Sequence, residues 1–196
     1  MKVLFKDENL IACIKPVGVD SEKQMPQIIA EQEKKQVYTV HRLDVNVEGV
    51  MVYAFNKNTA AYLSNCIRQG SMVKEYVACV HGTPDECGVL EDLLFKDSKK
   101  NKVFVVDKMR KGVKAAKLEY KRLSASDTSI VQIRLHTGRS HQIRVQFASR
   151  GYPLVGDHKY GSKAEQKTPM LYSCRITFPY KEKTVSFESF PHWMNT

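Results

Sequence analysis

Two polar stretches of the chain carry more reactive side chains than packing requires. The first, His41-Arg42-Leu43-Asp44, follows an expected strand, and the second, Thr-Gly-Arg-Ser-His-Gln-Ile-Arg at residues 137–144, enters an expected helix. Between them, Lys74 and Tyr76 are two residues apart in a further expected strand and so lie on the same face, which offers a cation and an aromatic ring. An aspartate carboxylate is a competent nucleophile or proton acceptor. These residue types therefore suit a nucleophilic or proton-transfer reaction.

Each of these residues also has an ordinary structural interpretation when it is taken alone. Asp44 would be a turn aspartate, Tyr76 a half-buried tyrosine of a sheet, and Arg144 a helix-surface arginine that covers apolar area with its stem. Their occurrence together in one chain, in a fixed order, favours a shared catalytic role.

In order and spacing, the stretches resemble the RluA-type family of RNA pseudouridine synthases. The family signature includes His-Arg-Leu-Asp, a later Lys-x-Tyr and Thr-Gly-Arg-x-His-Gln-Ile-Arg, and all three are present in that order. The resemblance continues through residues 151–157 and Tyr160-Gly161. It implies an isomerase that breaks the N1–C1′ bond of a uridine in RNA, turns the base in place and joins C5 to C1′.

The resemblance also implies a role for each site residue. Asp44 would be the catalytic nucleophile, Tyr76 would stack on the uracil, and Arg144 would pair with Asp44 and hold it ionised. Attack of Asp44 on C1′, attack on C6 and abstraction of a ribose proton all stay open. Arg42 resembles the family's arginine that fills the space left by the flipped nucleotide. Lys74 is also expected to bind RNA, and Arg139, His141 and Gln142, at the start of an expected helix, would organise the pocket rim and contact backbone phosphates.

The sequence departs from the family pattern at several positions. The common Thr-Ser-Gly appears as Val47-Glu48-Gly49, a histidine as Gln146, Asn-Lys-Pro as Ile14-Lys15-Pro16, and Leu-His-Ala as Leu171-Tyr172-Ser173. Because the three implied catalytic residues are kept, these changes bear on the choice of substrate more than on the reaction class.

The charge of the chain favours a polyanionic partner. With 31 Lys and Arg against 21 Asp and Glu, the formal net charge is +10. Residues 96–122 hold eleven basic and three acidic side chains, which alone would suit the solvated face of a hairpin. Taken together with the resemblance, this charge predicts that the segment binds the substrate, a ribosomal or transfer RNA.

The elements that must position these residues form a mixture in which strands outnumber helices. Helices are expected over residues 26–35, over 58–69 with Asn58 as N-cap, and over 141–149 with Ser140 as N-cap. Strands are expected at 9–14, 37–40, 49–55, 72–80, 103–106, 113–123, 128–135, 171–178 and 184–188. The resemblance implies an α+β fold, in which a mixed, largely antiparallel sheet with flanking helices forms two lobes around a central catalytic cleft. Residues 1–196 are expected to be a single catalytic domain.

Composition excludes several other classes of protein. No apolar run is long enough for a membrane span, and the first residues do not resemble a secretory signal, so we expect a cytoplasmic protein. The five scattered cysteines suit reduced thiols. Neither a metal nor an organic cofactor is expected, and the chain is expected to be a monomer without an obligate protein partner.

Two alternatives from other classes remain at this stage. An RNA-binding protein could keep the fold without the activity, which the charge and the loss of Thr-Ser favour; replacing Asp44 would then cost no function. A metal-dependent hydrolase could use His136, His141, Asp157 and His158, although no H-E-x-x-H or comparable spacing is present.

Overall fold

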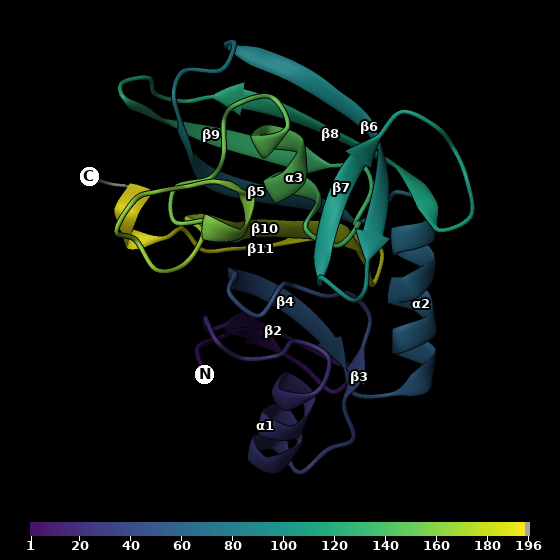
Figure 1. Cartoon of the computed structure of the whole chain (residues 1–196). Coiled ribbons are helices and arrows are strands. Elements are labelled where there is room, and N and C mark those ends of the chain that lie inside the picture. Colours follow the sequence, from purple (N-terminus) through teal and green to yellow (C-terminus); the bar gives the residue numbers. More distant parts are fainter. Residues whose placement is uncertain (195–196) are drawn as a thin grey trace. The chain divides into compact units, whose positions relative to one another are not determined.

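The computed structural model describes residues 1–194 and divides into two compact units. The first unit comprises Met1–Glu75 together with the C-terminal segment from Tyr172, and the second comprises Tyr76–Leu171. Each unit combines several strands with few helices, as Figure 1 shows, which confirms the expected α+β class. The two units correspond to the two expected lobes.

The first unit is built on a mixed sheet with strand order β1-β2-β4-β10, to which β3 adds at β4 and β11 at β10. All pairs are antiparallel except β4 with β10, which run parallel with Glu48 opposite Tyr172 and Gly49 opposite Ser173. A Cβ on Gly49 would collide with the backbone of Ser173, so this close approach requires glycine. The strands are β1 (Val3–Lys6), β2 (Leu10–Lys15), β3 (Tyr38–Thr39), β4 (Glu48–Ala54), β10 (Leu171–Tyr180) and β11 (Lys183–Glu188).

Two helices belong to the first unit, α1 (Gln24–Glu33) and α2 (Lys57–Arg68). α2 packs against β3 and β4 and places Leu63 in a core with residues of the sheet such as Val52 and Phe178. The predicted N-cap of α2 was wrong by two residues, because the Asn56 side chain, not that of Asn58, accepts the Thr59 amide at 2.9 Å.

The second unit has strand order β5-β9-β8-β6-β7, in which β6 pairs antiparallel with β7 and β8, and β8 pairs antiparallel with β9. The helix α3 (Gln142–Ala148) packs against β6 and β7 (Figure 1). Val145 of α3 closes a small core with Leu94, Val103 and Ala116. The strands are β5 (Val73–His81), β6 (Cys87–Asp97), β7 (Lys102–Val106), β8 (Val113–Arg122) and β9 (Thr128–Leu135).

The start of α3 differs from the prediction. His141, not Ser140, occupies the N-cap position with a left-handed backbone at φ 50°, and it makes no side-chain capping bond. The preceding turn is held by Gln142 instead, whose Oε1 accepts hydrogen bonds from the Thr137 hydroxyl and the Arg139 amide. Two short 3-10 helices complete the described chain, η1 (His158–Tyr160) and η2 (His192–Met194).

Candidate functional site

The predicted site residues divide between the two units. Arg42, Asp44 and Lys74 belong to the first unit, and the others belong to the second, namely Tyr76, Arg139, His141, Gln142 and Arg144. We therefore describe the surroundings of each group within its own unit.

Asp44 lies on a loop that several hydrogen bonds hold in place. The Ser21 hydroxyl donates to the Leu43 carbonyl at 2.9 Å and accepts from the Leu43 amide at 3.1 Å, while the Leu43 side chain is buried. The Val47 amide donates to the carbonyl of Asp44 itself at 3.0 Å, closing a turn. The backbone that carries the carboxylate is therefore fixed on both sides of Asp44.

Lys15 provides a further anchor for this loop and was not among the predicted site residues. Its fully buried side chain donates to the carbonyls of Pro16, Val19 and Val45, at 2.7, 2.9 and 3.1 Å. Burial lowers the pKa of Lys15 to about 8, although the negative charges of Asp44, Glu48 and Asp20 act in the opposite direction. The Lys15 ammonium thus ties the residue after Asp44 to the end of β2.

His41 lies in an apolar setting at the start of the first polar stretch. Its Nε2 accepts the Val52 amide at 3.1 Å, and its Nδ1 is buried without a hydrogen-bond partner among residues 1–194. Burial, and secondarily the charge of Lys74, lowers the pKa of His41 to about 3. The ring is therefore neutral near pH 7, with its proton on Nδ1. Burial likewise lowers the pKa of Lys74.

Arg42 is held only weakly by the protein. Its guanidinium lies 3.2 Å from the Glu22 carboxylate, and both side chains are about half exposed, at 47% and 50%. Exposed ion pairs of this kind contribute little to stability. Arg42 can therefore leave Glu22 at small cost and contact another partner.

Arg144 forms a buried, bidentate ion pair with Asp157, a partner that was not predicted. Nε donates to Oδ2 at 2.7 Å and Nη2 donates to Oδ1 at 2.9 Å. The exposed fractions of the two side chains are only 7% and 1%. A two-point contact fixes the guanidinium plane, and Nη1 takes no part in it.

Tyr160 connects Arg144 with His141. Its ring lies 5.2 Å from the Arg144 guanidinium carbon, and its hydroxyl lies 2.9 Å from His141 Nδ1. The same hydroxyl accepts the amide of Val103, which joins this group to β7. The arrangement orients both motif residues through a tyrosine that had no predicted role.

The remaining predicted residues of the second unit have internal contacts. The Gln142 amide nitrogen donates to the Lys117 carbonyl at 3.1 Å, and Arg139 Nε donates to the Ala115 carbonyl at 2.9 Å. Gln142 and Tyr76 are buried, with 3% and 5% of their surface exposed. Their proposed contacts with RNA stay predictions.

Comparison with known proteins decides the family. The sequence model of the RNA pseudouridylate synthases matches residues 9–149, a span that contains both polar stretches and the strand with Lys74 and Tyr76. The chain belongs to this family. Its members are isomerases that convert uridine in RNA to pseudouridine, so the predicted family and reaction class are confirmed.

Individual relatives cover nearly the whole of this family member. It is 30% identical to the dual-specificity RNA pseudouridine synthase RluA of Escherichia coli, over 95% of this chain and 91% of that protein. It is 29% identical to the ribosomal large subunit pseudouridine synthase D of Borreliella burgdorferi, of which the match covers 60%. An uncharacterized RNA pseudouridine synthase of Mycoplasma pneumoniae is 28% identical, and the chain spans 66% of its length.

Solved structures support the same fold. The human RNA pseudouridylate synthase domain containing 1 aligns with a TM-score of 0.85 at 19% identity, over 97% of this chain and 83% of that one. The human RNA pseudouridylate synthase domain containing 4 aligns with a TM-score of 0.83 at 23% identity, over 99% and 90% of the two chains.

The side chains suggested for a metal-dependent hydrolase have separate partners in this family member. His136 contacts Glu119, and Asp157 pairs with Arg144. The ring nitrogens of His158 lie 3.0 and 2.9 Å from the carbonyls of Ser162 and Gln166. Within residues 1–194 no group of three metal-ligating side chains forms, and the structure lends this alternative no support.

The basic segment comprises the end of β6, β7 and the whole of β8. β7 and β8 pair with opposite edges of β6, so the expected hairpin holds only for the β6–β7 part. We call residues 96–122 the basic hairpin. Arg110 lies over the ring of Phe95, and Lys117 pairs with Glu91 at 2.6 Å. Eight of its lysines are exposed, and seven of them make no ion pair or cation–π contact within residues 1–194: Lys96, Lys99, Lys100, Lys108, Lys111, Lys114 and Lys121.

Proposed function

We propose that this chain isomerises a specific uridine of a structured ribosomal or transfer RNA to pseudouridine, with Asp44 as the catalytic nucleophile. The observation that carries the proposal is the family match, because it spans Asp44, Tyr76 and Arg144 together. The fixed loop around Asp44 supports it, since a nucleophile must be held in a productive geometry. The names of the Escherichia coli and Borreliella burgdorferi relatives support RNA, including ribosomal RNA, as the substrate class.

The reaction balances without an external reductant or energy source. The N1–C1′ bond breaks, the uracil turns, the C5–C1′ bond forms, C5 loses its proton and N1 gains one. We infer that Arg144 pairs with Asp44 through the edge that Asp157 does not use, while Asp157 keeps the guanidinium plane fixed. Tyr76 would stack on the detached uracil so that it turns in place.

RNA recognition would combine a flipped base with distant phosphate contacts. Arg42, held only by an exposed pair with Glu22, would leave it and fill the vacated space in the RNA. Lys74, Arg139, His141 and Gln142 would organise the rim of the pocket. The unpaired lysines of the basic hairpin would contact backbone phosphates, which fix register without reading sequence.

Both units would work as one catalytic domain over residues 1–196, because the family match runs across them. We infer a cytoplasmic monomer that needs no protein partner to act on RNA. The longest helix among residues 1–194, α2, has 12 residues, so none of the described helices can span a membrane. Sedimentation of the purified protein, alone and with RNA, tests the monomer.

The experiment that tests the proposed function is pseudouridine mapping. RNA from cells that lack the gene is incubated with the wild-type protein or with Asp44→Asn, and every uridine is scored. We expect one site, or a small set, to be converted by the wild type alone. If neither protein changes a uridine while both bind RNA in a salt-dependent manner, the protein is a binder and the proposal is wrong.

A further inference from the structure

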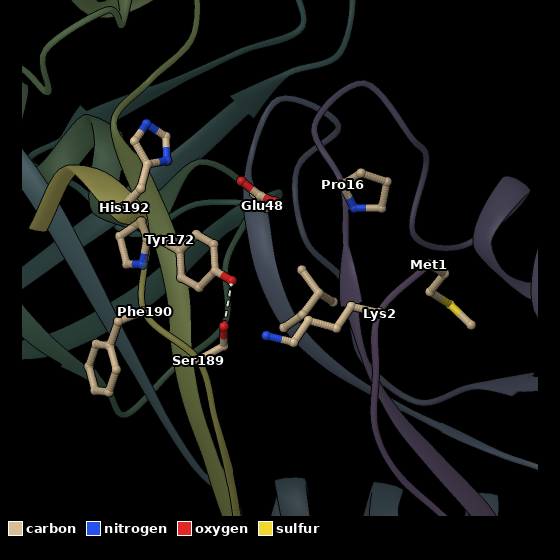
Figure 2. Close-up of a pocket in the computed structure, with 10 residues that line it drawn as sticks. Met1, Lys2, Pro16, Glu48, Tyr172, Ser189, Phe190 and His192 are labelled. Carbon is tan, nitrogen blue, oxygen red and sulfur yellow. Dashed lines mark hydrogen bonds between the residues drawn. The ribbon is translucent and has the colours of Figure 1, made fainter.

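A pocket of about 390 Å³ opens within the first unit, beside the loop that carries Asp44 but formed by other residues. Figure 2 shows Lys2 and Glu48 directed into it, with Tyr172, Ser189, Phe190 and His192 along one side. Its volume lies in the range of pockets that hold small organic ligands. None of these six residues belongs to the family signature or to the proposed catalytic group.

The wall of the pocket depends on the pairing of β4 with β10. Glu48 and Tyr172 are opposite each other in that parallel pair, and both are positions where the sequence departs from the family pattern. The Tyr172 hydroxyl donates to the Ser189 hydroxyl at 3.1 Å, and the Ser189 amide donates to the Cys174 carbonyl at 2.9 Å. The two departures thus meet in one place and are fixed there by the segment after β11.

Three ionisable side chains of the pocket have no hydrogen-bond or ion-pair partner within residues 1–194: Lys2, Glu48 and His192. The charge of Glu48 acts at a distance on the Lys15 ammonium, but the bonds of that ammonium go to backbone carbonyls. An anion and a cation are therefore left to face the same space, with the Tyr172 and Phe190 rings and the His192 imidazole along its side.

This combination matches the chemistry of a nucleotide. Aromatic side chains stack on bases, and a lysine ammonium binds phosphate as a point charge. A carboxylate accepts hydrogen bonds only, and guanine is the base with two adjacent N–H donors, N1–H and the 2-amino group, on its Watson–Crick edge. A carboxylate can therefore contact guanine at two points, whereas cytosine and adenine each offer it a single amino group there.

We propose that this pocket binds a guanine nucleotide of the RNA substrate, outside the reacting position, with its base edge on Glu48, its ring beside Tyr172 and its phosphate on Lys2. The identification of the nucleotide as part of RNA rests on the proposed function. Glu48 lies four residues along the chain from Asp44, so the pocket would then select the sequence around the target uridine.

Free mononucleotides are the probe for the test. The protein is titrated with the 5′-monophosphates of guanosine, adenosine, cytidine and uridine, and the amide resonances of Tyr172 and Ser189 are followed by NMR. We expect the guanine nucleotide to bind most tightly. Glu48→Gln should weaken binding of the guanine nucleotide by about tenfold or more. It should also move the preference toward adenine, because a glutamine amide both donates and accepts hydrogen bonds. Glu31→Gln, an exposed change on α1, serves as the matched control.

A second variant distinguishes recognition of the phosphate from recognition of the base. Lys2→Gln should weaken binding of the guanine nucleotide but leave binding of guanosine unchanged, whereas Lys183→Gln on β11 should change neither. Equal binding of all four nucleotides, or an unchanged guanine preference in Glu48→Gln, would overturn the proposal. If Glu48→Gln fails to fold by circular dichroism, the wild-type order of the four bases and the Lys2 result decide.

The test also distinguishes this inference from the proposed function. Asp44→Asn should bind the guanine nucleotide as the wild type does. A protein that binds guanine at Tyr172 but modifies no uridine would contradict the proposed function and leave the pocket as a nucleotide site. An active synthase whose nucleotide binding ignores Glu48 would contradict the pocket alone.

Discussion

Asp157 has a larger part in the site than its place in the sequence suggests. Its carboxylate binds two nitrogens of Arg144, and both side chains are almost completely withdrawn from solvent. A guanidinium that is held on one edge and supported by the ring of Tyr160 keeps its direction. Asp157 therefore acts as a positioning residue for Arg144.

Removing Asp157 should be costly because it leaves a buried, unpaired cation. We expect Asp157→Ala to lower the free energy of unfolding by about 3–5 kcal/mol. The exposed pair of Lys117 with Glu91 supplies the control, since Glu91→Ala should cost less than about 1 kcal/mol. Urea denaturation measures both values, and similar losses for the two variants would show that the buried pair has no special role.

His41 predicts a pH dependence of stability. Its pKa of about 3 in the folded protein lies below the ordinary value of 6.5, so the unfolded chain binds the proton more readily. The contribution of His41 to the free energy of unfolding is complete above pH 6.5. It is lost as the pH falls toward 3, by up to about 1.4 kcal/mol per pH unit. We expect the wild type to lose more stability than His41→Gln between pH 7 and pH 4.5.

The control for this pH effect is His136→Gln, which changes an exposed histidine beside Glu119. Its stability curve should keep the slope of the wild type between pH 7 and pH 4.5. Parallel curves for the wild type and His41→Gln would mean that His41 does not resist protonation in the folded state.

At the scale of elements, Lys15 anchors the loop that carries Asp44, the proposed nucleophile, to β2. Lys15→Met removes the donor to the Val45 carbonyl and should let the loop move. We expect turnover to fall by about ten- to a hundredfold with little change in KM, because small displacements of a reacting group are costly. Amide exchange should accelerate over residues 43–47.

Lys57→Met, an exposed change at the start of α2, is the control for the loop and should alter neither turnover nor exchange. Faster exchange in Lys15→Met at an unchanged turnover would show that the rigidity of this loop does not contribute to the rate.

Apolar patterns, strand-forming residues and cap signals predicted the three helices and nine of the eleven described strands, whereas β1, β6 and the N-caps of α2 and α3 were not predicted correctly. In β6 the buried Leu90 and Leu94 are four residues apart, which is a helical spacing, and only the pairing with β8 on one side and β7 on the other makes this segment a strand. The short strand β1 depends in the same way on β2. Neither partner can be read from the local sequence.

The site shows the same division between pattern and tertiary contact. The motif carries Asp44, Tyr76 and Arg144, so a sequence could point to them. The supports could not be found in this way, because Lys15 reaches Val45 across 30 residues and Asp157 reaches Arg144 across 13. Such contacts exist only once the sheet and the turns have formed, although a lysine directly after the apolar residues of β2 can indicate a buried anchor.

For the whole molecule, the uneven distribution of its +10 charge predicts salt-dependent binding of RNA. Changing Lys99, Lys100 and Lys111 of the basic hairpin to Gln should reduce the slope of log affinity against log salt by about 0.7–0.9 for each lost phosphate contact. Fluorescence anisotropy with labelled RNA at several salt concentrations measures the slope.

A control variant with the same change in net charge distinguishes the effect of where the lysines lie from the effect of how much positive charge is removed. Lys34, Lys57 and Lys183 are exposed lysines of the first unit, and replacing these three with Gln should leave most of the slope intact. Equal losses in the two triple variants would mean that total charge, and not the basic hairpin, attracts the RNA.

The most direct test of the account is whether Asp44 is required for loss of the C5 proton. RNA from cells that lack the gene, labelled with tritium at C5 of uridine, is incubated with excess wild type, Asp44→Asn or the exposed control Asp85→Asn. We predict tritium release by the wild type and by Asp85→Asn, and none by Asp44→Asn, with similar RNA affinity for all three. Release by Asp44→Asn at the wild-type rate would contradict the assignment of Asp44 as the nucleophile.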